Sequence, residues 1–120
     1  MSMVGVVINY RGGKHTQYPY QVIVEFPGVK TKEDAQKLVG KRVIWISPGK
    51  FKVFVGVITR FHGNKGRVRV RFHKGVPGQM IGDVVYLIED PNLINKIQQE
   101  VKKAKDINQA HKIVRQILGV

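Results

Sequence analysis

The sequence predicts a mainly β protein, in which about six short strands close into a small barrel and a helical hairpin follows at the C-terminus. Through residue 89, short runs rich in Val and Ile alternate with Gly- and Pro-containing turns, a pattern typical of barrels and sandwiches. After residue 90, apolar residues recur at helical spacing instead. The chain has 120 residues, enough for one modest core and too few for two. We therefore expect a β-barrel over residues 1–89 and a helical extension over residues 90–120.

A closed barrel is favoured over an open sheet because closure removes exposed strand edges. The predicted strands cover residues 3–10, 20–26, 41–47, 53–61, 67–72 and 84–88. One short helix is expected between the second and third strands. Thr31 would cap this helix, which would run to Val39 and end at Gly40.

Two amphipathic helices are predicted after residue 90. Asp90 is expected to cap the first helix, with Pro91 at its first position, and Asp106 with Gln109 resembles the capping box of the second. Gly119 would end the second helix. A hairpin of this size is unstable alone, so its apolar stripes either cover the barrel or contact a neighbouring molecule.

The charge of the chain points to a polyanionic partner. Lys and Arg number 21 against eight Asp and Glu, which gives a net charge of +13 and a pI near 10.3. A field of this sign attracts nucleic acids. The absence of cysteine excludes disulfides, a thiol nucleophile and a zinc ribbon. With no long apolar run and no signal-peptide pattern, we expect an intracellular protein without a membrane partner.

The run RVRVRF at residues 67–72 is the most informative stretch. Its three apolar residues are expected to face the core, which places its three arginines on the opposite face, about 6.6 Å apart along the strand. Like charges in such a row repel one another, and a phosphodiester chain would relieve that repulsion through forked hydrogen bonds. An ordinary solvated face is the alternative, but such a face usually mixes Lys, Glu and Thr. No acidic partner is expected for these arginines.

Two glycine-rich loops add further cations. The glycines of the turn HGNKG at residues 62–66 allow its backbone to approach a ligand closely, and the loop at residues 11–17 contains two cations and a histidine. Tyr18, beside that loop, is a candidate for base stacking. Plain turn formation is the alternative for both loops. The candidate nucleic-acid-binding residues are Arg11, Lys14, His15, Gln17, Tyr18, Arg60, His62, Asn64, Lys65, Arg67, Arg69, Arg71 and Lys74.

Catalysis is not expected. The four histidines lie in different predicted elements, with no ligand spacing that would indicate a metal site. Ser2 and Ser47 are the only serines, and neither has a base in its sequence context. The run Gly12-Gly13-Lys14 is too short for a phosphate-binding loop of the kind that binds nucleotides. We therefore predict no catalytic residue, no metal, no cofactor and no small-molecule substrate.

The segment GVITRFHGNKGRV at residues 56–68, continuing to Val76-Pro77, resembles the signature of a known family. This is the archaeal and eukaryotic large-subunit ribosomal protein family L35Ae, also called eL33. The segments at residues 9–18 and 40–45, and Pro77-Gly78-Gln79 with Gly82-Asp83, are also similar to it. The resemblance covers about residues 3–89. Val57, Val70 and Val76 depart from it, where lysine, alanine and leucine respectively are common in the family.

The resemblance implies a closed six-stranded, Greek-key-like barrel of the translation-protein type. It also implies a structural constituent of the large ribosomal subunit that binds ribosomal RNA in the cytoplasm, beside neighbouring ribosomal proteins. The motif positions include four residues around the 62–66 turn and three in the first loop, namely Arg60, His62, Lys65, Arg67, Arg11, Lys14 and His15. The helical hairpin is the larger departure, because compact archaeal members lack it.

The function predicted from all of these features is RNA-backbone binding by the arginine face and the two loops, as part of the large subunit. Residues 91–120 contain six cations and two acids, a surplus of +4, and are expected to contact RNA or a neighbouring ribosomal protein. A free chromatin-type barrel that binds DNA is the main alternative. An RNA-modifying enzyme is a second alternative, but the sequence offers neither a cofactor loop nor a paired acid and base.

Overall fold

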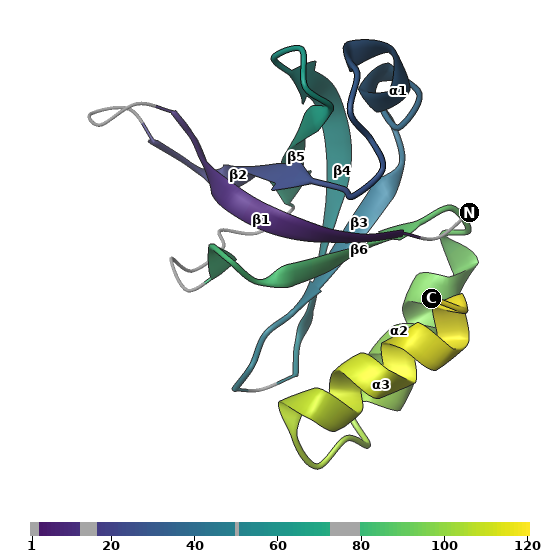
Figure 1. Ribbon diagram of the computed structural model, residues 1–120. Helices are drawn as coiled ribbons and strands as arrows, with labels where there is room; N and C mark the ends of the chain where they lie inside the picture. The colour runs from purple at the N-terminus through teal and green to yellow at the C-terminus, as the bar shows by residue number, and fades with distance from the viewer. Residues whose placement is uncertain (1–2, 13–16, 50, 73–79) are drawn as a thin grey trace.

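The computed structural model describes the backbone of residues 3–12, 17–49, 51–72 and 80–120, and their side chains except those of residues 10–12 and 17–20. Within these residues the chain forms six strands and three helices (Figure 1). In chain order they are β1 Met3–Gly12, β2 Gln17–Glu25, α1 Lys32–Gln36, β3 Arg42–Ile46, β4 Val53–His62, β5 Arg67–Phe72, β6 Val84–Ile88, α2 Asn92–Val101 and α3 Ile107–Leu118. No helix in the described part of the chain has both the length and the apolar character needed to cross a membrane.

The six strands form a closed antiparallel barrel in the order β1-β2-β5-β4-β3-β6. The barrel closes where β6 pairs with β1 on one side and β3 on the other. The pairing of β2 with β5 joins strands that are far apart in the chain, as a Greek-key-like arrangement requires. The predicted mainly β fold, with a closed six-stranded barrel and C-terminal helices, is confirmed.

Inside the barrel, alternate residues of each strand build one apolar core. Val68, Val70 and Phe72 of β5 face inward as predicted, at 0–1% exposure. Trp45 of β3 is fully buried in the same core, and its indole Nε1–H donates to Asp83 Oδ2 at 3.0 Å. This bond satisfies the one polar atom that a buried indole carries.

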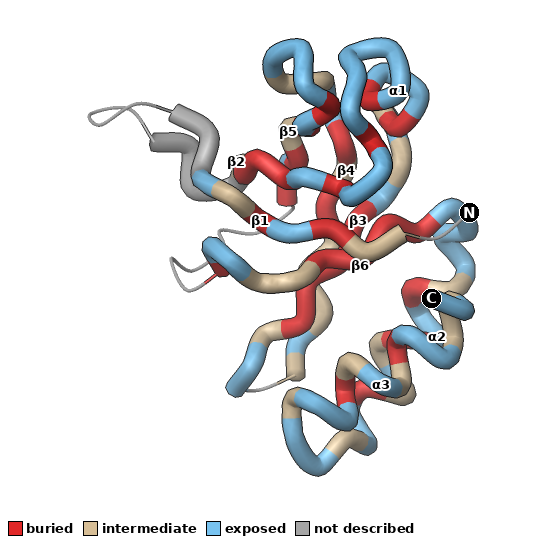
Figure 2. Tube along the Cα trace, in the orientation of Figure 1, coloured by how far each residue is buried: buried red, intermediate tan, exposed pale blue. Residues whose placement is uncertain are grey.

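A second apolar cluster lies between the outside of the barrel and the helical hairpin. β3 and β6 are buried on both faces, because the residues that alternate with the inner core pack under α2 and α3 (Figure 2). The cluster is built on Ile44, Ile46, Tyr86 and Ile88 of the barrel and on Ile94, Ile97, Val101, Ala110 and Val114 of the helices. The apolar stripes of the hairpin therefore cover the barrel, which settles the alternative that the sequence left open.

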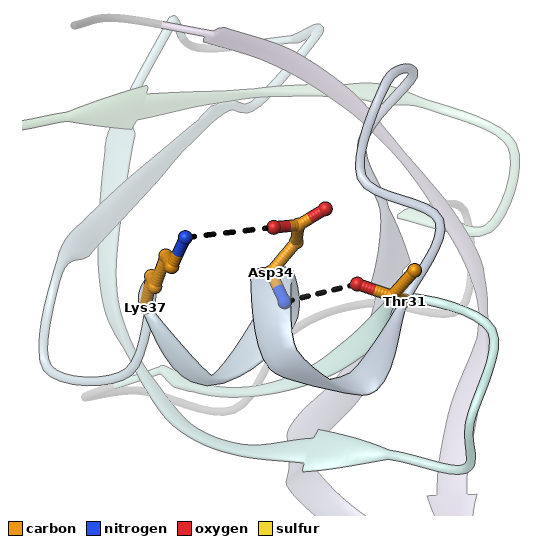
Figure 3. A network of polar contacts seen from close by, with 3 residues as sticks. All are labelled: Thr31, Asp34 and Lys37. Atoms are coloured by element: carbon orange, nitrogen blue, oxygen red, sulfur yellow. Dashed lines mark hydrogen bonds and ion pairs between the residues drawn. The ribbon is translucent and has the colours of Figure 1, made fainter.

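The short helix α1 begins as the sequence predicts and ends earlier. Thr31 is its N-cap, with Oγ1 accepting a hydrogen bond from the Asp34 N–H at 3.1 Å, and Lys37 lies 3.8 Å from the Asp34 carboxylate (Figure 3). The helix ends at Gln36 rather than Val39, and the chain continues in turns. Gly40 has φ +92°, and its N–H donates to Ile58 O at 2.8 Å, so the return to the barrel uses a conformation that favours glycine.

α3 has the predicted cap, whereas α2 begins at Asn92, so Pro91 is at the N-cap position and not at the first helical position as predicted. Asp90 Oδ1 accepts from the Asn92 N–H at 3.0 Å. Asp106 Oδ1 accepts from the Gln109 N–H at 2.8 Å, and Gln109 Oε1 accepts in return from the Lys105 N–H at 2.8 Å. The second cap is thus a capping box whose return bond is shifted by one residue. Gly119 ends α3 in the left-handed conformation, with φ +74°.

Candidate nucleic-acid interface

The arginines of β5 lie on the outside of the barrel, as the alternation predicts. Arg67 and Arg71 are exposed and Arg69 is partly buried, while the residues between them are in the core. At the usual rise of a strand, neighbouring arginines of this row are about 6.6 Å apart, which is close to the spacing of phosphates along a nucleic acid strand.

A β-bulge in β4 brings two more predicted residues to the same face. Ile58 pairs with Val70, but Arg60, not Thr59, is the next residue paired, opposite Arg69. The extra residue reverses the alternation of inward and outward side chains. Ile58 therefore points into the core, while Arg60 and His62 point outward. Simple alternation from Ile58 would have turned both inward.

The second of these residues is His62, and it is tied to the arginine row. Arg69 Nε donates to His62 Nδ1 at 3.1 Å. The Nδ1 atom carries no proton when it accepts this bond. The bulge therefore produces a pair in which the histidine fixes the direction of one guanidinium.

Arg67 has an acidic partner, which corrects the expectation that the row has none. Its Nε lies 3.7 Å from Glu25 Oε2, and the two side chains are 47% and 50% exposed. An ion pair as exposed as this contributes about 0–1 kcal/mol. A phosphate could replace Glu25 at little cost.

The turn after β4 is pressed against the chain segment that precedes α1. Gly66 has φ +92°, and a Cβ there would lie 2.1 Å from Val29 O and 2.8 Å from Lys30 N. Only a residue without a side chain permits this approach. The turn, which carries Lys65, therefore packs its backbone at Gly66 against the backbone of Val29 and Lys30, and Lys30 is a cation that the sequence did not single out.

A ring contact joins the same two segments. Lys32 Nζ lies 4.9 Å and Arg60 Cζ 5.2 Å from the centroid of the Phe61 ring. Both distances are within the range of cation–π attraction. Lys32, in α1, is thus a second cation near the end of β4 that the sequence did not single out, because only the folded topology brings α1 to this end of the strand.

Arg42 is a third missed cation. The register places Arg71 of β5 opposite Val57 of β4, and Val57 opposite Arg42 of β3. Arg42 and Arg71 are both exposed and flank Val57, about 10 Å apart at two strand spacings.

We define the β4–β5 surface as the outward cations of β4, of β5 and of the turn between them, together with His62. Its residues are Arg60, His62, Lys65, Arg67, Arg69 and Arg71.

The described start of β2 lies away from the 62–66 turn. Glu25, at the end of β2, lies beside Arg67 at the start of β5, whereas Gln21 pairs with Arg71 near the end of β5. The first residues of β2, which precede Gln21, therefore extend past the end of β5 that is opposite to the 62–66 turn. The hairpin of β1 and β2 is longer than predicted, since β1 reaches Gly12 and Gly12 pairs with Gln17.

Several predicted residues fall outside what the structure describes. For Arg11 in β1 and for Gln17 and Tyr18 in β2 the backbone alone is described, and Lys14, His15 and Lys74 lie outside the described residues. Asn64 is exposed in the 62–66 turn beside Lys65.

Among the described residues, no group of three or more His, Asp or Glu side chains is placed to hold a metal ion. In the same part of the chain no buried side-chain polar atom lacks a hydrogen-bond partner. Burial raises the pKa of Tyr86 and lowers the pKa of His111. Tyr86 is in β6 and His111 is in α3, so neither belongs to the arginine row of β5.

The fold and this surface together define a small basic β-barrel protein with an outward cationic face suited to a polyanion. Comparison with known proteins identifies the family. The model of the family described as ribosomal protein L35Ae matches residues 1–88. The chain belongs to this family.

Three relatives illustrate the match, and each is named large ribosomal subunit protein eL33. The protein of Methanopyrus kandleri is 52% identical over 83 residues, which cover 69% of this chain and 92% of the relative. That of Tetrahymena thermophila is 36% identical and covers 69% of this chain and 79% of the relative. For Dictyostelium discoideum the identity is 33%, with 75% and 93% covered.

The helical hairpin lies beyond the family match, which ends at residue 88. With 92% of the Methanopyrus protein already matched, the remainder of that protein is too short to hold two helices of this size. The hairpin is therefore an addition to the barrel that this relative does not share.

Proposed function

We propose that this chain is a structural constituent of the large ribosomal subunit in the cytoplasm and that it binds ribosomal RNA through the β4–β5 surface. Family membership and the shared name of the relatives support the first part. In this proposal residues 1–89 are the RNA-binding barrel, residues 90–120 are an extension, and the partners are ribosomal RNA and neighbouring ribosomal proteins. The protein works by shape and charge, without catalysis, cofactor or small-molecule substrate.

One observation carries the RNA-binding part. The bulge in β4 and the alternation of β5 place Arg60, Arg67, Arg69 and Arg71 on one outward face. Cations in such a row neutralise phosphates along a backbone and give binding that is set by shape more than by base sequence. Lys30, Lys32 and Arg42 extend this face on both sides, and Arg11, Lys14, His15, Gln17, Tyr18, Asn64 and Lys74 complete the proposed contacts.

The test compares two double variants of the full chain. R67Q/R71Q removes two exposed cations of the β4–β5 surface, and K37Q/K52Q removes two exposed cations elsewhere. Tagged chains are expressed in cells, and extracts are sedimented through a sucrose gradient in high salt. The wild type and K37Q/K52Q should remain in the large-subunit peak, while R67Q/R71Q should be depleted from it.

Binding to purified large-subunit RNA gives the second measurement. When the logarithm of the binding constant is plotted against the logarithm of the salt concentration, R67Q/R71Q should reduce the magnitude of the slope by about 2. This is about 1 for each lost phosphate contact. Equal behaviour of the two double variants would overturn the assignment of the surface. Equal wild-type affinity for duplex DNA and for this RNA would favour the chromatin-type alternative.

A further inference from the structure

A groove of about 600 Å³ lies between α3 and the start of β6. Val84 lines it from the barrel, and Asn108, His111, Lys112, Arg115 and Gln116 line it from α3. These α3 residues are three or four positions apart, so they form one face of the helix. The volume is in the range of sites that bind small ligands or a unit of a larger one.

The groove is cationic and is rich in hydrogen-bond donors. Lys112 and Arg115 supply the positive charge and the two amides supply neutral donors; no Asp or Glu lines the groove, and Gly119 and the C-terminal residue Val120 complete its lining. In the described part of the chain, neither Lys112 nor Arg115 forms an ion pair within 4 Å of a carboxylate. Asp83 acts on His111 from the barrel side, but its Oδ2 accepts the bond from Trp45.

Buried contacts hold the base of the groove in place. The Tyr86 hydroxyl lies 2.6 Å from His111 Nδ1, and Arg115 interacts with the same hydroxyl. Burial raises the pKa of Tyr86 and lowers the pKa of His111, so at neutral pH the phenol is protonated and the ring is neutral. One hydrogen bond joins the phenol to the imidazole, and this bond keeps the His111 ring against the barrel at the base of the groove.

We propose that this α3 groove is a second site for the RNA phosphodiester backbone, in which Lys112 and Arg115 pair with phosphate oxygens and Asn108 and Gln116 hydrogen bond to phosphate or ribose. The proposal rests on the proposed function for the identity of the partner and uses a separate set of residues. The hairpin lies outside the family match, so this contact belongs to the extension.

The test uses the full chain and purified large-subunit RNA, with K112Q/R115Q as the groove variant and K96Q/K102Q as its matched control. The control removes two exposed cations of the same hairpin outside the groove. We expect K112Q/R115Q to weaken binding tenfold or more and to reduce the salt slope by about 1.8, since each phosphate contact contributes about 0.9. The control should reduce the slope by less than half as much. K112E keeps the arginine and should weaken binding in the same direction if the double variant folds poorly.

Acetylation of lysines by a water-soluble reagent provides a readout that needs no variant. Lys112 should be protected when RNA is bound, and Lys96 and Lys102 should stay reactive. Unchanged reactivity of Lys112, or equal effects of the two double variants, would overturn the proposal. Protection of Lys112 by AMP or inorganic phosphate alone would make the groove a small-phosphate site and would also overturn it.

The two proposals fail differently in this experiment. If the wild type does not bind the RNA, the proposed function fails. If R67Q/R71Q weakens binding while K112Q/R115Q does not, the β4–β5 surface stands and the groove fails alone.

Discussion

Replacing Gly66 by alanine should destabilise the barrel much more than replacing Gly40, although both glycines have φ +92°. A Cβ at Gly40 would meet nothing within 4 Å, whereas a Cβ at Gly66 would lie 2.1 Å from Val29 O, 2.6 Å from Val29 C and 2.8 Å from Lys30 N. The two substitutions share the backbone strain. The close approach of the turn to the segment before α1 is the difference between them.

The expected magnitudes follow from these contacts. A non-glycine residue in a left-handed conformation costs about 1–2 kcal/mol, which is the whole expected effect of G40A. G66A adds an overpacking cost of about 1–3 kcal/mol. The upper part of that range is expected, because the obstructing atoms are backbone and cannot rotate away. The free energy of unfolding should therefore fall by about 3–5 kcal/mol in G66A.

Urea denaturation followed by far-UV circular dichroism measures both variants against the wild type. The urea concentration at the midpoint of unfolding should fall for both variants, and more for G66A. The slope of the free energy of unfolding against urea concentration should stay constant if unfolding remains two-state. A G66A effect within about 0.5 kcal/mol of the G40A effect, a difference smaller than the added overpacking cost, would refute the reasoning. Because the turn that carries Lys65 is held against Val29 and Lys30 at Gly66, G66A should weaken RNA binding and G40A should leave it unchanged.

Three further predictions concern the helical hairpin. I97A should lower the free energy of unfolding by about 2–5 kcal/mol, since Ile97 is fully buried in the second apolar cluster; an effect below 1 kcal/mol in urea denaturation would contradict its packing role. D106A should cost about 1 kcal/mol and speed amide hydrogen exchange in the first turn of α3, whereas D106N should retain most of the cap. The lowered pKa of His111 means that the unfolded chain binds more protons below about pH 6.5, so stability should fall as the pH drops from 7 towards 5. H111Q should make that fall shallower, and an identical pH profile would contradict the burial of the imidazole.

The sequence was sufficient for the fold because local signals agreed with one another. The RVRVRF run placed its valines inside and its arginines outside without reference to any other strand. The caps at Thr31, Asp90 and Asp106 each depend on residues no more than three apart. Gly119 at the end of α3 is also a local signal, because its left-handed φ concerns one residue.

The candidate surface was predicted only in part, because some of its geometry depends on contacts between distant residues. The bulge at Thr59 turns Arg60 and His62 outward, and only the register with β5 reveals it. Lys32 comes near the end of β4 through the Phe61 ring, and Arg42 joins the surface through strand order. The sequence of β6, VVYLI, also indicates where the hairpin lies. A continuous apolar run is typical of a strand that is buried on both faces, so another element must cover the outside of the barrel at β6.

That two-faced burial has a consequence for the evolution of the family. Ile44, Ile46, Tyr86 and Ile88 are apolar on the outside of the barrel because α2 and α3 cover them. In a lineage whose protein stops after β6, the same four positions face solvent or another partner, and selection for solubility should favour polar residues where solvent remains. Gain or loss of the extension should therefore be accompanied by substitutions at these four sites, so that aligned barrel sequences would reveal which lineages carry the helices even from gene fragments that end before them.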